Sequence, residues 1–270
     1  MISFPNAKIN LGLNIVERRD DGYHNIETVF YPVPLTDVLE IVPATGEASL
    51  MCYGNVVDCP AEKNLVMKAY RLMQQRYDLP PVAMHLYKHI PDGAGLGGGS
   101  SDAAHAMLML NTMFGLHMPD AELAAMAATL GADCPFFILN TPCYAEGIGE
   151  KLQPIPLNLS GLYLAIVRPA IPVSTKEAFS LITPMHPERN CRDIVMSPVE
   201  SWRDQLVNDF EKSVFTLYPE IGRIKQRLYD LGAVYAAMSR SGSSLFGIFR
   251  SPVVLDEFDS EGTFKTLLRL

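Results

Sequence analysis

Hydrophobic and polar side chains alternate in residues 7–16, AKINLGLNIV. Every second side chain is apolar from Ala7 to Ile15, and the positions between them carry polar or small residues, Lys8 and Asn10 among them. A period of two is typical of a strand, because successive side chains point to opposite faces of a sheet. We therefore expect a strand with one apolar and one polar face.

A turn signal, Asp21-Gly22, follows this strand, and the strand pattern resumes in residues 26–33, IETVFYPV. Asp-Gly between two such segments is a strong hairpin signal, because both residues adopt the backbone conformations that tight turns require. The predicted hairpin places Tyr23 and His24 just past its turn.

Helical and strand patterns alternate in the next part of the chain. Apolar residues at helical spacing extend over residues 61–77, and a strand pattern over residues 82–90 leads directly into a glycine-rich loop. Residues 43–46 and 53–60 are expected to form turns between short strands.

Two helices and a strand are predicted after the glycine-rich loop. The first helix begins with the good capping residues of the segment Ser100–Asp102. Residues 120–131 have helical spacing, with Asp120 as the expected N-cap. The apolar run FFIL, residues 136–139, predicts a buried strand.

A cluster of prolines around Pro154 and Pro156 predicts a domain boundary. We expect an N-terminal domain of residues 1–155 and a C-terminal domain of residues 156–270, each mixing helices with strands. In the second domain, strands are expected over residues 162–167, 233–239 and 244–249, and helices near residues 177–182 and over residues 221–232.

Composition narrows the class of protein. The chain has 270 residues, with 48% hydrophobic and 19% charged side chains, which is the make-up of an ordinary globular protein. Its net charge of −8 argues against binding to the phosphate backbone of nucleic acids, which requires clustered Lys and Arg. The five cysteines are odd in number and form no C-x-x-C pattern, so neither a disulfide framework nor a zinc ribbon is expected.

The N-terminal sequence lacks the basic and long apolar segments of a signal peptide. No stretch approaches the roughly 18 consecutive apolar residues of a membrane span. We therefore expect a cytoplasmic protein that does not bind a membrane and that works as a monomer or a homodimer.

Five glycines lie in the stretch GAGLGGG, residues 93–99, which matches two nucleotide-binding patterns in part. It satisfies G-x-G-x-x-G, but the acidic residue at the right distance, Asp120, opens a helix instead of ending a second strand. It also begins the P-loop pattern, but Gly99 stands where that pattern has lysine. The chain has no H-R-D or D-F-G tripeptide, so a protein kinase is excluded.

The order of strand, glycines, hydroxyls and helix nevertheless favours phosphate binding. Glycines let a phosphate approach the backbone N–H groups, and the positive end of the following helix attracts anions. Ser100 and Ser101 add hydroxyl ligands for phosphate or magnesium. The alternative is a structural loop that closes onto a buried, alanine-rich helix.

Three segments in order along the chain resemble the motifs of the GHMP kinases, the family of galacto-, homoserine, mevalonate and phosphomevalonate kinases. PNAKINLGLNI is similar to the N-terminal motif, PDGAGLGGGSSDAA to the second and MSRSGSSLFGIF to the C-terminal motif. The resemblance implies an α+β fold of two domains. The N-terminal domain would be a ribosomal-protein-S5-domain-2-like nucleotide-binding domain, and the C-terminal one a ferredoxin-like domain that contributes to the substrate cleft.

The resemblance also implies ATP as co-substrate, with Mg²⁺ bridging its phosphates. The residues implied to bind ATP are Pro91, Gly93, Gly95, Leu96, Gly97, Gly98, Gly99, Ser100 and Ser101. In the C-terminal motif, Arg240 stands where the family pattern has glycine. An arginine is disfavoured there if the position requires a positive φ, or else it adds a cation near the triphosphate.

Longer runs narrow the resemblance within the family. AKINLGLNIVERRDDGYHNIET, LGADCPFF and AEGIGE are similar to the branch that phosphorylates a tertiary hydroxyl of a cytidine-diphosphate sugar alcohol in the non-mevalonate isoprenoid pathway. A mevalonate-type or homoserine-type kinase, a dinucleotide-dependent oxidoreductase and a non-catalytic nucleotide-binding module remain as alternatives.

Asp133 and Lys8 are the candidate catalytic residues. Phosphoryl transfer requires positioning, charge neutralisation and a group that orients or deprotonates the attacking hydroxyl. The match of LGADCPFF implies that Asp133 is this base. Lys8 lies on the polar face of the first strand, where a cation would keep Asp133 ionised and neutralise charge on the transferring phosphoryl group. The alternatives are a turn aspartate and an exposed strand lysine.

Four residues are candidate ligands of the acceptor: Asn10, Tyr23, His24 and Phe179. The resemblance implies that Tyr23 and His24 bind the cytosine. A pyrimidine has flat faces and an edge of donors and acceptors, so the aromatic ring of Tyr23 and the imidazole of His24 suit it; the alternative is a hairpin turn with a half-buried tyrosine. The resemblance also implies that Phe179 is the second stacking ring. Asn10 shares the strand face of Lys8.

Overall fold

The computed structural model describes residues 1–55 and 59–270, so the predicted turn of residues 53–60 lies partly outside the described residues. The chain forms two compact units. Unit 1 contains residues 1–7, 35–92 and 97–141, and unit 2 contains residues 8–34, 93–96 and 142–270. The glycine loop therefore contributes to both units. The division between residues 155 and 156 remains a prediction about domain organisation.

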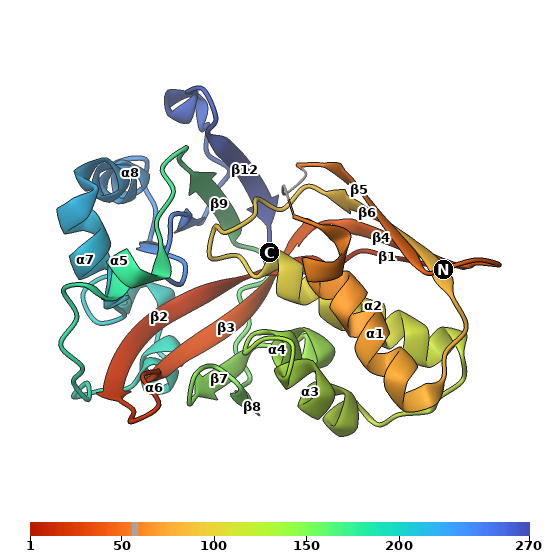
Figure 1. Ribbon diagram of the computed structural model, residues 1–270. Helices are drawn as coiled ribbons and strands as arrows, with labels where there is room; N and C mark the ends of the chain where they lie inside the picture. The colour runs from red at the N-terminus through yellow and green to blue at the C-terminus, as the bar shows by residue number, and fades with distance from the viewer. Residues whose placement is uncertain (56–58) are drawn as a thin grey trace. The chain divides into compact units, whose positions relative to one another are not determined.

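Unit 1 has a four-stranded sheet with the order β1-β4-β6-β5, in which β4 runs antiparallel and β5 parallel to β6. Helices α1 and α2 lie side by side and contact β5 and β4 respectively, and α3 and α4 pack against α2 (Figure 1). The strand predicted over residues 82–90 is confirmed, and so are the helix predicted before it and the helix predicted after the glycine loop. The elements are β1 (Ile2–Ser3), β4 (Val38–Pro43), β5 (Ser49–Gly54), α1 (Leu65–Tyr77), β6 (Val82–Lys88), α2 (Gly98–Met113), α3 (Asp120–Ala128) and α4 (Cys134–Leu139).

The predicted strand of residues 136–139 is wrong, because these residues lie in helix α4. Pro135 stands in the first turn of this helix, where its fixed φ and missing N–H are favourable. The helix ends at Asn140, which has a φ of 47° and donates its N–H to the Phe136 carbonyl at 2.7 Å. A short apolar run suits a buried strand and a buried helix equally, so the pattern alone could not separate them.

Helices α2 and α3 begin before their predicted capping residues. The N-cap of α2 is Gly97, which has a φ of 75°, and the helix starts at Gly98. The N-cap of α3 is Pro119, and Asp120 is already helical. The segment Ser100–Asp102 therefore lies inside the first turns of α2, and its side chains are available for other contacts.

In the described residues, unit 2 has two four-stranded sheets. One has the order β2-β3-β7-β8 (Figure 1) and the other the order β10-β11-β9-β12. The predicted hairpin of β2 and β3 and the predicted strand pair of β10 and β11 are confirmed, as is the α+β class. The strands are β2 (Asn6–Arg18), β3 (His24–Thr36), β7 (Cys143–Glu146), β8 (Lys151–Pro154), β9 (Tyr163–Arg168), β10 (Tyr235–Met238), β11 (Leu245–Phe249) and β12 (Phe264–Arg269). The helices are α5 (Thr175–Phe179), α6 (Cys191–Val195), α7 (Phe210–Leu217) and α8 (Pro219–Asp230). Among the described residues of the whole chain, no helix is long and apolar enough to span a membrane.

Both faces of β2 are buried, although its pattern has only one apolar face. Lys8 and Asn10, on the polar face, are 0% and 1% exposed. Asn10 contacts Ser239 in the turn after β10, and the Lys8 ammonium lies 4.9 Å from the centre of the Phe30 ring on β3. The polar residues of this strand therefore form an enclosed network, and Lys8 is not an exposed strand lysine.

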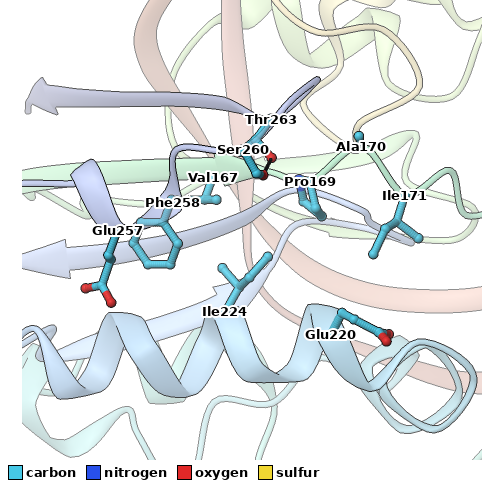
Figure 2. Close-up of a pocket in the computed structure, with 10 residues that line it drawn as sticks. All are labelled: Val167, Pro169, Ala170, Ile171, Glu220, Ile224, Glu257, Phe258, Ser260 and Thr263. Carbon is cyan, nitrogen blue, oxygen red and sulfur yellow. Dashed lines mark hydrogen bonds between the residues drawn. The ribbon is translucent and has the colours of Figure 1, made fainter.

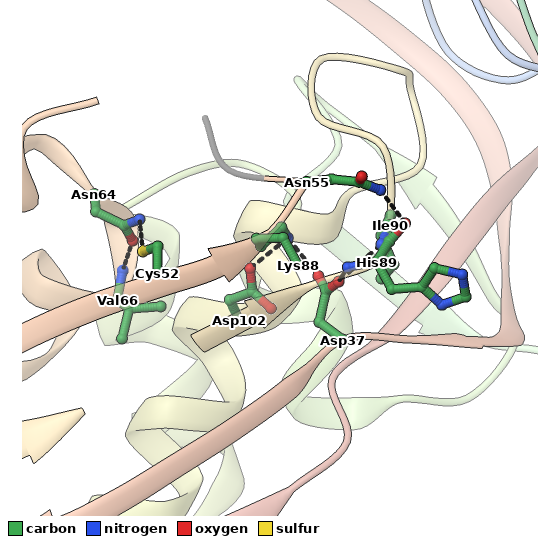
Figure 3. A network of polar contacts seen from close by, with 9 residues as sticks. All are labelled: Asp37, Cys52, Asn55, Asn64, Val66, Lys88, His89, Ile90 and Asp102. Atoms are coloured by element: carbon green, nitrogen blue, oxygen red, sulfur yellow. Dashed lines mark hydrogen bonds and ion pairs between the residues drawn. The ribbon is translucent and has the colours of Figure 1, made fainter. Parts of the chain in front are cut away.

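A buried ion cluster in unit 1 fixes the start of the glycine loop (Figure 3). The Lys88 ammonium, at the end of β6, pairs with the carboxylates of Asp37 and Asp102, the latter at 2.7 Å. Asp37 also accepts hydrogen bonds from the backbone N–H groups of His89 at 2.6 Å and Ile90 at 2.8 Å. Because Asp102 lies near the start of α2, the cluster joins the strand end, the loop and the helix.

We predict that Asp102→Asn changes how stability depends on pH. Burial raises the pKa of the Asp102 carboxyl from 3.8 to about 7, against the opposing effect of Lys88. The folded protein holds this proton more tightly than the unfolded chain, so the stability contribution is fully present below about pH 4 and is lost as the pH rises through about 7. When the pH is raised from 5 to 8, the free energy of unfolding, measured with urea, should fall on the order of 2 kcal/mol more in the wild type than in Asp102→Asn.

The matched control for this measurement is Asp204→Asn, which removes an exposed carboxylate. It should follow the pH dependence of the wild type. If Asp102→Asn also followed the wild type, the raised pKa of Asp102 would be contradicted.

Candidate active site

The glycine loop combines glycines that the fold requires with one that it does not. Gly93, Gly95 and Gly97 have φ values of 60°, 77° and 75°, in the left-handed region that glycine adopts at no steric cost. A Cβ at Gly95 would also collide with the Ser239 carbonyl. Gly99, by contrast, lies in α2, and a Cβ there would be 3.9 Å from the nearest atom. Its missing side chain leaves space beside the helix start, as a phosphate-binding backbone requires.

The structure brings Asp133 close to this end of α2. Asp133 is 3% exposed and occupies the N-cap position of α4. The thiol of the next residue, Cys134, is hydrogen-bonded to the Ser100 hydroxyl. The end of the glycine loop and the candidate base therefore lie together within unit 1.

A cavity opens beside the same end of α2. Its walls come from β5, β6, α1 and α2 and include Cys52, Asn64, Leu65, Lys88, Gly99 and Asp102. Figure 3 shows how Asn64 is held, with its amide directed at the Cys52 sulfur while its Oδ1 accepts the N–H of Val66 at 2.9 Å. Polar and charged side chains thus lie among apolar ones in this cavity, and convergent polar groups in a concave site make it a candidate ligand pocket.

Sequence reasoning missed this cavity, because its lining residues come from four elements that meet only in the fold. Asn64 is a good capping residue, but it lies within residues 61–77, where the apolar spacing predicted a helix, so it gave no separate signal of the cavity.

Two buried polar atoms at the start of α2 need a partner. Among the described residues, Ser101 Oγ and Asp102 Oδ1 are buried without any hydrogen-bond partner. Such atoms are costly, so they indicate a place for a ligand or water. Mg²⁺ that binds with substrate phosphates takes one or two carboxylates from the protein, and the Asp102 carboxyl, which also lines the cavity, is a group of this kind. The described residues contain no group of three or more His, Cys, Asp or Glu side chains that could hold a metal by itself.

Lys8 is the buried cation beside the loop in unit 2. Its ammonium donates to Asn10 Oδ1, and the Asn10 amide donates in turn to Thr28 Oγ1 at 3.0 Å. Burial, followed by the positive charge of Arg240, holds the pKa of Lys8 well below its usual value. An anion bound next to Lys8 would raise this pKa again. In this structure Asn10 orients the Lys8 ammonium.

The turn after β10 connects the loop with the strand of Lys8. The Ser239 hydroxyl donates to the Gly95 carbonyl at 2.8 Å and accepts the Asn10 N–H at 3.3 Å. Asn208 donates to two carbonyls of this turn, including that of Arg240 at 2.8 Å. Arg240 has a φ of 52°, so its position does require the left-handed conformation.

Two of the three candidate base-binding residues, His24 and Phe179, meet at the start of β3. Tyr23, directly before this strand, is 62% exposed. The His24 ring is stacked on Phe179, with 4.4 Å between ring centres and 20° between ring planes. Phe179 ends α5 and contacts Phe210 edge-on at 4.8 Å. The fold thus places Phe179 beside the hairpin, although the two are far apart in the chain.

A second cavity lies in unit 2, between α8 and the strands of the second sheet (Figure 2). Ile224 and Phe258 give it an apolar wall, and the carboxylates of Glu220 and Glu257 flank it. No predicted site residue of the described chain lines this cavity. We therefore leave it outside the candidate site.

The predicted site residues are divided between the two units. Unit 1 holds Pro91, Asp133 and the ATP-binding residues from Gly97 to Ser101, and unit 2 holds the loop residues Gly93, Gly95 and Leu96 together with Lys8, Asn10, Tyr23, His24 and Phe179. The pairing of Lys8 with Asp133 stays a prediction.

Comparisons with known proteins point to one family. The family model described as "GHMP kinases N terminal domain" matches residues 64–141, and the one described as "GHMP kinases C terminal" matches residues 197–260. A 4-diphosphocytidyl-2-C-methyl-D-erythritol kinase from Parabacteroides distasonis is 54% identical over 257 residues, which cover 95% of this chain and 94% of that protein. The kinase of the same name from Bacteroides fragilis is 53% identical over 267 residues, covering 98% and 97%.

Solved structures agree with these matches. The crystal structure of a 4-(cytidine 5'-diphospho)-2C-methyl-D-erythritol kinase is 35% identical, with a TM-score of 0.79 over 92% of this chain and 90% of that one. A homoserine kinase from Cytophaga hutchinsonii shares the fold at 16% identity, with a TM-score of 0.69 over 98% and 95%. The N-terminal family match includes the glycine loop and Asp133, and the C-terminal match includes the turn of Arg240. The chain therefore belongs to the GHMP kinase family.

Proposed function

We propose that this kinase transfers the γ-phosphoryl group of ATP to the 2-hydroxyl of 4-diphosphocytidyl-2-C-methyl-D-erythritol, a step of the non-mevalonate isoprenoid pathway. The observation that carries the proposal is the 54% identity, over 95% of the chain, to a kinase named for this substrate. The glycine loop beside a buried carboxylate, and the aromatic side chains at the hairpin, support it.

The ATP is proposed to bind at the start of α2. Its adenosine would occupy the cavity between Asn64, Leu65 and Lys88, and its phosphates would contact the loop backbone beside Gly99. Backbone N–H groups at a helix start attract phosphate oxygens. Ser101 and Asp102 would hold Mg²⁺, which neutralises charge on the triphosphate.

Asp133 is the proposed base. It would take the proton of the 2-hydroxyl while that oxygen forms a bond to the γ-phosphorus. The bond between the γ-phosphorus and the β–γ bridging oxygen breaks in the same transfer, and ADP leaves. Lys8 would supply positive charge to the oxygens of the transferring group. This anion would also oppose the effect of burial on the pKa of Lys8.

Tyr23 and Phe179 are proposed to stack on the cytosine, with His24 binding its edge. Aromatic stacking on a base contributes about 1–3 kcal/mol. His24 covers a face of Phe179 at 4.4 Å, so cytosine could use this face only after the imidazole moves aside. The displaced imidazole would then be close to the edge of the base.

A substrate panel tests the acceptor. ADP release should be measured with the cytidine-diphosphate sugar alcohol, with mevalonate and with homoserine in separate reactions. We expect turnover with the first substrate alone. Faster turnover with mevalonate or homoserine would favour a sibling kinase. The cytoplasmic location and the choice between monomer and homodimer stay predictions.

Gly99→Ala should weaken ATP binding without destabilising the fold. The new Cβ would lie 3.9 Å from the nearest atom, and alanine is more favourable than glycine in a helix by about 1 kcal/mol. The same methyl group would obstruct the approach of the triphosphate, so the Kd for ATP in calorimetry should rise about tenfold or more. Gly46→Ala, at a turn with open space, is the control. An unchanged Kd in folded Gly99→Ala would refute the phosphate placement.

Asp133→Asn should lower kcat about 100- to 10,000-fold, because the amide cannot accept the hydroxyl proton. The affinity for ATP, measured by calorimetry, should change little. Asp120→Asn, at an exposed position in the same unit, should retain wild-type turnover. Wild-type kcat in Asp133→Asn would rule out its role as base.

Tyr23→Ala should raise the KM for the cytidine substrate about tenfold while leaving the KM for ATP nearly unchanged, because only the cytidine substrate loses a stacking ring. Steady-state kinetics with each substrate varied in turn measures both constants. Tyr23→Phe, which keeps the ring, should behave like the wild type. An equal rise in both KM values would contradict cytosine stacking.

A further inference from the structure

Arg240 keeps a long, charged side chain at a position where the backbone favours glycine. Its φ is 52°, and the other described residues with a positive φ that are not glycine are Asp78, His117 and Asn140. Glycine adopts this conformation freely, and Asp, Asn and His adopt it more readily than other side chains. An unfavourable conformation that persists in a fold points to a use for the side chain.

The backbone of Arg240 is held firmly. Asn208 donates to the carbonyls of Met238 at 2.7 Å and Arg240 at 2.8 Å. Ser239, between these residues, donates its hydroxyl to the Gly95 carbonyl at 2.8 Å. Arg240 could move away from the glycine loop only by breaking these hydrogen bonds.

The side chain of Arg240 starts beside the loop. A Cβ added at Gly95 would lie 3.4 Å from the Cβ of Arg240. The guanidinium lies several bonds beyond this Cβ, so it has the reach to contact a phosphate bound along Gly93–Leu96.

Arg240 also adds to the positive charge around Lys8. Its charge lowers the pKa of Lys8, after the larger effect of burial, and burial lowers the pKa of Arg240 itself. An anion with more than one negative charge is attracted by both of these positive side chains. The terminal phosphate of ATP is such an anion.

We propose that the guanidinium of Arg240 binds the terminal phosphate of ATP through two of its N–H groups. This inference rests on the proposed function, because a kinase brings that phosphate to this loop. The planar fork of donors in arginine matches two phosphate oxygens. No proton is exchanged with Arg240, which stabilises the negative charge of the phosphoryl group before and during its transfer.

Arg240→Gly tests the proposal, because it removes the side chain and relieves the backbone. Glycine relieves the backbone, but the contacts of the arginine side chain are lost, so urea unfolding first establishes that the variant is folded. By calorimetry, the affinity for the non-hydrolysable analogue AMP-PNP should fall about 10- to 100-fold, while the affinity for ADP changes less than about twofold. The kcat with the cytidine substrate should fall at least about tenfold.

Two further variants complete the experiment. Arg240→Asn keeps a residue that tolerates a positive φ but carries no charge, so it should behave like Arg240→Gly. Asp78→Gly, at the end of α1 with a φ of 49°, is the matched control and should change stability alone.

Wild-type kcat and wild-type AMP-PNP affinity in Arg240→Gly would overturn the proposal. An equal loss of affinity for AMP-PNP and ADP would also overturn it, because that result would indicate a changed loop shape. A third outcome separates this proposal from the proposed function. If the wild type binds AMP-PNP more tightly than Arg240→Gly does, but does not phosphorylate the cytidine substrate, the proposed acceptor is refuted and the role of Arg240 is supported.

Discussion

Burial of the Lys88 ammonium is the constraint on which unit 1 depends. A buried charge requires charged partners, and here they are Asp37, before β4, and Asp102, near the start of α2. Asp37 also binds the N–H groups of His89 and Ile90, directly before the glycine loop. One cluster thus holds the end of a strand, the start of the loop and the start of a helix, and so it positions the backbone that is proposed to bind phosphate.

Buried charge has a different consequence in unit 2. In unit 1 the Lys88 ammonium is held between side-chain oxygens of Asp37 and Asp102, which favours a fixed structure. Lys8 and Arg240 both carry positive charge, and the pKa of Lys8 is lowered by burial and by Arg240. This arrangement favours binding of an anion. Ser239 connects it to the loop through the Gly95 carbonyl and to the first strand through Asn10.

The spacing of apolar residues was sufficient to predict a helix or a strand wherever that spacing fits only one of the two. The alternation in residues 7–16 predicted β2, and the spacing of residues after the glycines predicted helix α2. The same reasoning failed for residues 136–139, because four apolar residues in a row suit a buried helix as well as a buried strand. It also left open whether Lys8 faces solvent, which depends on the distant turn that covers its strand.

The sequence by itself was sufficient to identify the family, because three motifs occur in order along the chain. It also determined which residue types are available to bind phosphate and a base. The tertiary structure alone decided that His24 stacks on Phe179, that four elements enclose a cavity at the start of α2, and that Arg240 starts beside Gly95. The physical reason is that backbone propensity and capping act over a few neighbouring residues. Contacts between distant residues form only when the folded chain buries its apolar surface and pairs its buried polar groups.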